Sequence, residues 1–129
     1  MGKLNPEVTE YIEQQPAALQ PALRELRALI RSAFPKASEE MYAPGKAAKM
    51  ATDFPMYKQG DEIVASFAAR SVGPRLYIDA DVVERYSEQL GSLVQGKVCV
   101  LYKPNKLLDA EALRRLTVQM LAEAAAKKN

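Results

Sequence analysis

The chain has 129 residues, of which 48% are hydrophobic and 26% are charged, and its 18 basic and 16 acidic side chains leave a net charge of +2. This length and composition predict one globular domain, spanning residues 1–129, that buries a core without metals or disulfides. The small net charge provides no general field for nucleic acid or an anionic membrane, so we expect neither as a partner. With one cysteine and no apolar run near its start, the chain is expected to be cytoplasmic.

The N-terminal part predicts two helices. Asn5 can cap a short first helix that has Pro6 in its first turn. A second helix is expected over residues 17–33, with Pro21 in its first turn and an apolar stripe along one side. The side opposite this stripe carries Arg24, Arg27 and Arg31. We interpret this arginine row as the solvated side of the helix, because no aromatic stacking platform for nucleic acid accompanies it.

The middle of the chain predicts an antiparallel meander of strands. Residues 35–53 follow no regular period, and we expect an elongated connection with one short strand there. The extended runs on either side of residues 59–61 form a hairpin, because Gly60 can adopt the positive backbone angle of a tight turn. A second turn at residues 71–74 leads into a further strand over residues 75–78.

The second arm of the hairpin has two distinct sides. Alternation places Ile63, Ala65 and Phe67 on the side that faces the core. The opposite side is lined by small groups and carries Val64, Ser66 and Ala68.

The C-terminal part predicts a helix, a strand and a last helix. Asp79 or Asp81 can cap a helix that runs to Leu90, and Asp109 can cap the last helix. Between these helices, the stretch GKVCVLYK at residues 96–103 is apolar on both sides, as in a strand at the middle of a covered sheet. The order of elements predicts an α+β fold. We expect a single-domain α/β sandwich with an antiparallel meander sheet covered by amino- and carboxy-terminal helices.

The lone cysteine, Cys99, lies in this last strand. A reactive thiolate needs a histidine, a cation or a helix N-terminus to lower its pKa, and the chain has no histidine. We therefore interpret Cys99 as a small buried hydrophobe and keep a cysteine-dependent enzyme as a third hypothesis. No motif for nucleophilic, nucleotide-binding or histidine-metal chemistry occurs in the sequence, so we predict no catalytic residues.

Several segments resemble the YdhG-like domain family. The strongest signals are the FP-x-Y turn at residues 54–57, the LYI at residues 76–78 and the GK-x-C at residues 96–99, and the resemblance extends over nearly the whole chain. It implies a small α/β sandwich. Some members of this family are described as frataxin-like iron chaperones, so the resemblance also implies a role in handling iron.

Two surfaces are candidates for function. Strand alternation allows one sheet face to combine a floor of small residues, tyrosine walls and lysines near the rim. This candidate face contains Tyr57, Lys58, Ser66, Tyr77, Lys97 and Cys99. It can accept a ligand, a partner or a second copy of the chain, or be filled by the chain's own helices. The first helix carries carboxylates at every third residue, Glu7, Glu10 and Glu13, which offer oxygen ligands to iron or form a plain solvated face.

The leading hypothesis is a non-enzymatic binding or chaperone-like domain that engages an unidentified protein partner or small ligand through one sheet face. We expect such a domain to use no cofactor. Its partner can be a second copy of the chain, which would form a homodimer. The alternative is a frataxin-like carrier that binds iron through surface carboxylates.

Overall fold

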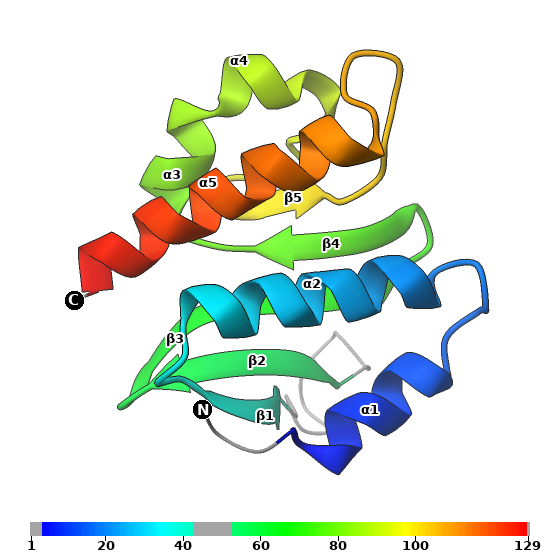
Figure 1. The fold of residues 1–129 in the computed structure, drawn as a ribbon, viewed down its shortest axis with the longest axis vertical. Coiled ribbons are helices and arrows are strands. Elements are labelled where there is room, and N and C mark those ends of the chain that lie inside the picture. The colour runs from blue at the N-terminus through cyan, green and yellow to red at the C-terminus, as the bar shows by residue number, and fades with distance from the viewer. Residues whose placement is uncertain (1–3, 43–52, 129) are drawn as a thin grey trace.

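The structure is a computed structural model that describes residues 4–42 and 53–128 (Figure 1). Its helical elements are α1 (Pro6–Glu13), α2 (Gln20–Ala33), α3 (Ala80–Arg85), α4 (Ser87–Leu90), the short 3-10 helix η1 (Gly91–Leu93) and α5 (Ala110–Lys128). Its strands are β1 (Ser38–Tyr42), β2 (Phe54–Gln59), β3 (Glu62–Arg70), β4 (Gly73–Tyr77) and β5 (Cys99–Leu101). Within the described residues, no helix combines the length and the apolar character needed to cross a membrane.

The strands form one sheet in the order β1-β2-β3-β4-β5, and every neighbouring pair is antiparallel. This meander, with helices from both ends of the chain, confirms the predicted α+β fold. Figure 1 shows α1, α2 and α5 on the same side of the sheet. We call the side that they cover the inner face and the opposite side the outer face.

The inner face holds the core. Tyr57 pairs with Ala65, Phe67 pairs with Leu76, and Leu76 pairs with Val100, and all five side chains are almost fully buried. They pack against the apolar stripes of the two long helices, which include Leu23, Leu26 and Ile30 of α2 and Leu113, Leu116, Met120 and Leu121 of α5. Removal of this apolar surface from water is the main stabilising term of the fold.

Several predicted element ends are confirmed by local contacts. Gly60 has a φ of 62°, as the predicted hairpin turn requires. The Asp79 carboxylate accepts a hydrogen bond from the backbone N–H of Val82 at 3.2 Å, so Asp79 caps α3. The Asp109 carboxylate accepts one from the backbone N–H of Ala112 at 2.8 Å at the start of α5. The short strand predicted within residues 35–53 is β1, and residues 43–52 of that connection lie outside the described residues.

A β-bulge changes the predicted faces of β3. The register places Tyr57 opposite Ala65 but Lys58 opposite Ile63, so one residue of β3 is extra at this point. Ile63 was predicted to face the core and is instead 49% exposed. Val64 was predicted on the opposite side and is instead buried in the core in place of Ile63.

The strand that carries Cys99 lies at the edge of the sheet, so its predicted place in the middle is wrong. Its free side is covered by the segment before it. Val94 forms an isolated antiparallel bridge with Val100, and the backbone N–H of Gln95 donates to the carbonyl oxygen of Cys99 at 2.9 Å. Covering of an edge in this way explains why the strand is apolar on both sides without being central.

Candidate binding face of the sheet

Strand pairing places three of the predicted site residues in one row of the outer face. Ser66 of β3 pairs with Tyr77 of β4, and Tyr77 pairs with Cys99 of β5. Residues that are directly opposite in a sheet share a face, so these side chains lie side by side. Met56 pairs with Ser66, and Glu40 pairs with Met56, which extends the row across β2 to β1.

A cluster of three aromatic rings lies on the same face. Tyr42 pairs with Phe54 across β1 and β2, and their ring centroids are 5.0 Å apart. The Phe54 centroid is 6.3 Å from that of Tyr77. The guanidinium carbon of Arg70 lies 5.8 Å from the Phe54 centroid, within reach of a cation–π interaction. We call Tyr42, Phe54 and Tyr77 the ring cluster.

Small side chains form the floor beside these rings. Ala68 and Cys99 are 0% and 6% exposed, and Ser66 is 5% exposed. Phe54 and Tyr77 are larger and only half-buried, so their rings project beyond this floor. A hollow of about 330 Å³ opens beside Ser66 and Tyr77 at the end of the sheet near the C-terminus of α5.

Cations gather at the other end of this face, near the turn between β3 and β4. Arg75 pairs with Ala68, and Arg70 pairs with Gly73, so both arginines belong to the outer face. The side chain of Lys103 reaches the same end, since a Cβ atom on Gly73 would lie 3.8 Å from the Lys103 Cδ. No local pattern joins these cations to the aromatic rings, because the two groups meet only through the register of the sheet.

Cys99 is not prepared as a nucleophile. Burial raises the pKa of its thiol, and the nearby Arg75 guanidinium and Tyr77 hydroxyl offset only part of this rise. A thiol whose pKa is raised holds little reactive thiolate at neutral pH. The Cys99 side chain therefore forms part of the floor of small side chains.

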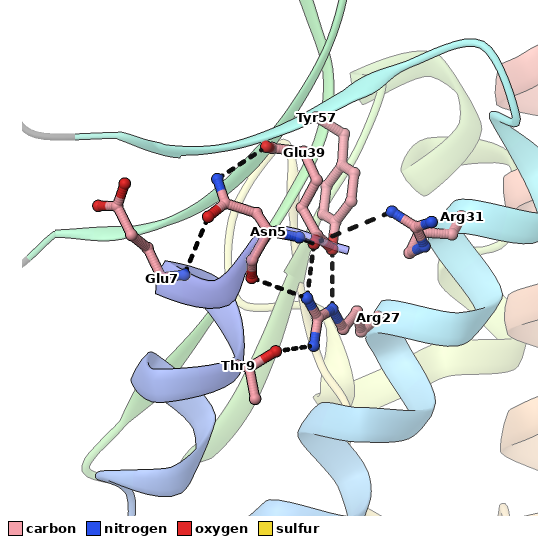
Figure 2. Close-up of polar contacts among 7 residues, drawn as sticks. All are labelled: Asn5, Glu7, Thr9, Arg27, Arg31, Glu39 and Tyr57. Carbon is pink, nitrogen blue, oxygen red and sulfur yellow. Dashed lines mark hydrogen bonds and ion pairs between the residues drawn. The ribbon is translucent and has the colours of Figure 1, made fainter. Parts of the chain in front are cut away.

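Tyr57 does not belong to the candidate face, so this part of the prediction is wrong. It pairs with Ala65 on the inner face and is 0% exposed. Its neighbour Met56, one residue earlier in β2, occupies the outer face instead. The Tyr57 hydroxyl donates a hydrogen bond of 2.6 Å to Glu39 (Figure 2).

The lysines predicted at the rim are separated. Lys58 pairs with Ile63 at the end of β2 beyond the bulge, and alternation places it on the outer face. Lys97 precedes β5 and lines a different hollow, together with Ala80 and Val83 of α3. Only Lys58 therefore remains next to the predicted surface.

Glu39 is the centre of a buried polar network (Figure 2). Its side chain is fully buried and accepts hydrogen bonds from Arg27 Nε at 2.9 Å and Arg27 Nη2 at 2.6 Å. It also accepts from the Tyr57 hydroxyl and from the backbone N–H of Asn5, the latter at 2.9 Å. Arg27 donates further to the Thr9 hydroxyl at 2.9 Å and to the Asn5 carbonyl oxygen at 3.1 Å. The network joins α1 and α2 to β1 and β2.

This network corrects the interpretation of the arginine row, because Arg27 is buried rather than solvated. Burial acts to raise the pKa of Glu39, but hydrogen bonds from Arg27, Tyr57 and Asn5 outweigh it and hold the pKa below its ordinary range. Burial and the Glu39 carboxylate raise the pKa of Tyr57, so its phenol keeps its proton. A carboxylate with this many donors is a structural connection rather than a reaction centre.

The three predicted metal ligands do not converge. Glu7 and Glu10 line a hollow of about 470 Å³ with Asp53 and Tyr11, whereas Glu13 is not part of its lining. Across residues 4–42 and 53–128, no group of three or more His, Cys, Asp and Glu side chains is placed to hold a metal ion.

Comparisons of this chain with models of protein families, with curated proteins and with solved structures find no significant match.

Replacement of Glu39 tests the network. In the Glu39→Gln variant, Arg27 loses its buried counter-charge, and we expect the free energy of unfolding to fall by about 3 kcal/mol. Glu40→Gln is the matched control, because Glu40 is the next residue in β1 and lies on the outer face. Its replacement should change the free energy of unfolding by less than about 0.5 kcal/mol. Urea unfolding at pH 7 measures both values. Equal stability of Glu39→Gln and wild type would contradict the role given to Glu39.

The same variant has a predicted pH dependence. The folded-state pKa of Glu39 is lowered, so its contribution to stability is complete above the ordinary carboxyl pKa of about 4.3 and is lost as the pH falls below it. Wild type should therefore lose stability between about pH 5 and pH 3 more steeply than Glu39→Gln. Urea unfolding at a series of pH values measures the free energy of unfolding of both proteins. Parallel pH profiles for the two proteins would be inconsistent with a paired carboxylate.

Thiol labelling tests the account of Cys99. Because the side chain is 6% exposed and its pKa is raised, we expect a maleimide at pH 7 to label the folded protein at least about tenfold more slowly than the urea-unfolded protein. Mass spectrometry over time measures the rate. Labelling of the folded chain at the unfolded rate would show an open, reactive thiol and reopen the enzyme hypothesis.

Proposed function

We propose that this chain is a non-enzymatic, cytoplasmic binding domain that engages a ligand or a partner through the outer face of its sheet. The binding surface is the ring cluster with its small-residue floor and the cations beside it, formed by Tyr42, Phe54, Ser66, Arg75, Tyr77 and Cys99. A relationship to YdhG-like domains is part of this proposal, since the antiparallel sheet and flanking helices agree with the layout that the resemblance implies.

The observation that carries the proposal is the ring cluster itself. Its rings contact one another on the outer face, while the core cluster formed with the helices consists of inner-face and helical side chains. Tyr42 is 38% exposed, and Phe54 and Tyr77 are half-buried. A contiguous aromatic surface with a polar rim is typical of sites where proteins bind other molecules.

The chemistry of the face favours binding over catalysis. Its thiol has a raised pKa, and the polar groups beside the ring cluster are mainly guanidinium, hydroxyl and ammonium groups that donate hydrogen bonds. The carboxylates of Glu62 and Asp79 line the adjacent hollow and form ion pairs with Lys128 and Lys127. A general base would need an acceptor with a pKa near neutrality. The one carboxylate in the row, Glu40, accepts a hydrogen bond from the Ser38 hydroxyl at 2.5 Å. These groups can hold and orient a molecule without transforming it.

Fragment mapping by NMR tests the proposed function. We expect a library of neutral, cationic and anionic fragments to shift the backbone amide signals of Ser66, Tyr77 and their neighbours more than those of any other surface. Tyr77→Ala should remove these shifts. Val118→Ala, on the exposed side of α5, is the matched control and should leave them unchanged.

Two results would contradict the proposal. One is that no fragment shifts the outer-face signals. The other is that the fragments collect in the apolar groove between α2 and α5, which is lined by Leu29 and Val118. Thermal unfolding of both variants would confirm that they remain folded.

A further inference from the structure

The hollow beside the ring cluster combines three kinds of lining. It opens where β3 begins and β4 ends, and its volume is about 330 Å³. Small-molecule sites have volumes of about 300–1,000 Å³, so a small molecule fits here. The lining contains two carboxylates with one ammonium group, exposed aliphatic side chains, and the hydroxyl-bearing residues Ser66 and Tyr77.

Ser66 is a buried polar residue of this lining without a partner. Its side chain lies on the outer face, opposite Tyr77, and is only 5% exposed. Within residues 4–42 and 53–128, no group forms a hydrogen bond with its hydroxyl. This hydroxyl is not one of the unpartnered polar atoms that are closed off from solvent, so it is reached through the hollow. Buried polar groups are almost always hydrogen-bonded, and the hydroxyl therefore indicates a partner that enters the hollow.

The carboxylate of Glu62 also has an acceptor to spare. Lys128 contacts its Oε1, and the other oxygen, Oε2, has no partner in the described part of the chain. The Glu62 side chain is 59% exposed, so a molecule in the hollow can reach it. A carboxylate accepts several hydrogen bonds, and a second donor beside Lys128 is therefore favourable.

Negative charge exceeds positive charge at this end of the hollow. The Lys127 ammonium lies 2.6 Å from Oδ2 of Asp79 and 3.1 Å from Oδ2 of Asp81. Together with the pair of Glu62 and Lys128, three carboxylates share two ammonium groups. One negative charge is therefore left without a cation of its own among these five side chains.

This balance favours a cation over an anion as the ligand. The nearby hairpin contributes Lys58 and Asp61, one charge of each sign, and so does not change the balance. An anion in the hollow would meet the carboxylates of Glu62 and Asp79, which repel it. A cation is attracted by both carboxylates and also by the half-buried ring of Tyr77.

The remaining lining determines the uncharged part of the ligand. Ile63 and Val98 are 49% and 44% exposed, and an alkyl chain that covers them removes apolar surface from water. Asp79 follows Tyr77 by two residues, and Tyr77 lies opposite Ser66. The carboxylate and the serine are therefore about 7 Å apart along the strand, a distance that a chain of about five carbon atoms spans.

We propose that the hollow binds a small aliphatic amino alcohol in its protonated form. The ammonium group of the ligand lies at the carboxylates of Glu62 and Asp79, and its hydroxyl group forms a hydrogen bond with Ser66. Its alkyl chain covers Ile63 and Val98. This inference rests on the proposed function, because the hollow adjoins the ring cluster on the outer face, and it specifies the ligand class.

Four probes with the same five-carbon chain test the ligand class by NMR titration at pH 7. They are 5-aminopentanol, pentylamine, 1,5-pentanediol and the anion 6-hydroxyhexanoate. We expect 5-aminopentanol to shift the amide signals of Ser66 and Tyr77. It should bind at least about threefold more tightly than pentylamine, which lacks the hydroxyl, and at least about tenfold more tightly than the two probes without an ammonium group.

Variants locate the two ends of the ligand. Ser66→Ala should weaken the binding of 5-aminopentanol at least about threefold and leave the affinity for pentylamine unchanged. Glu62→Gln should weaken the binding of both amines at least about threefold. Glu111→Gln is the matched control, because Glu111 is a similarly exposed carboxylate that is paired with Arg115 on α5. It should bind both amines as wild type does.

Thermal unfolding establishes that the variants are folded. Because no described residue contacts the Ser66 hydroxyl, Ser66→Ala should unfold at the same temperature as wild type. A lost affinity in this variant then reports the missing hydroxyl and not a damaged fold.

The outcomes separate this inference from the proposed function. Equal binding of 5-aminopentanol and pentylamine would show that the ligand makes no bond to Ser66 and would overturn the assignment. So would equal binding of the diol, tighter binding of the anion, an unchanged affinity in Ser66→Ala, or the absence of shifts with all four probes. In each of these cases the proposed function still stands if fragments of another chemistry occupy the outer face, and it fails if none does.

Discussion

The fold depends on strand alternation in a sheet whose main helices lie on one side. In an antiparallel meander with short turns, each residue is fixed to one face by its cross-strand partner. Phe67 points into the core beneath α2 and α5, and its neighbour Ser66 therefore points away from them. The same constraint that builds the core leaves a second face on which Tyr77 and Phe54 are held in place by the backbone ladder.

The Glu39 network fixes the register of β1, the edge strand of the sheet that is nearest to the N-terminus. One carboxylate receives donors from α2, from β2 and from the residue before α1, so three segments far apart in the sequence meet at a single buried charge. A shift of β1 by one residue would turn Glu39 to the outer face and leave Arg27 buried without a counter-charge. By fixing that register, the network also fixes Tyr42 opposite Phe54, and so it supports the ring cluster from the other side of the sheet.

Local patterns in the sequence were sufficient to predict much of the fold. The Gly60 turn, the Asp109 cap and the shared face of Ser66, Tyr77 and Cys99 follow from turn chemistry, capping and alternation. Tyr57 was misplaced because its face depends on the number of residues counted around the hairpin. A shift of one residue in that count reverses the face, and the sequence does not reveal the register.

Contacts between distant segments were beyond the reach of such patterns. Helical periodicity placed Arg27 among solvated arginines, because its partner Glu39 lies in a segment with no regular period. Tyr42 and Phe54 meet only through the pairing of β1 with β2. The candidate site was therefore predictable in its central row and not in its aromatic and cationic surroundings.

The central claim is that the rings of Tyr42, Phe54 and Tyr77 are accessible to solvent on the outer face. Hydroxyl-radical footprinting of the folded protein, read by mass spectrometry, tests it most directly because modification depends on access to the side chain. We expect Tyr42 and Tyr77 to be modified, while Tyr57, which is fully buried on the inner face, stays protected until the chain unfolds. Protection of Tyr42 and Tyr77 equal to that of Tyr57 would contradict the account.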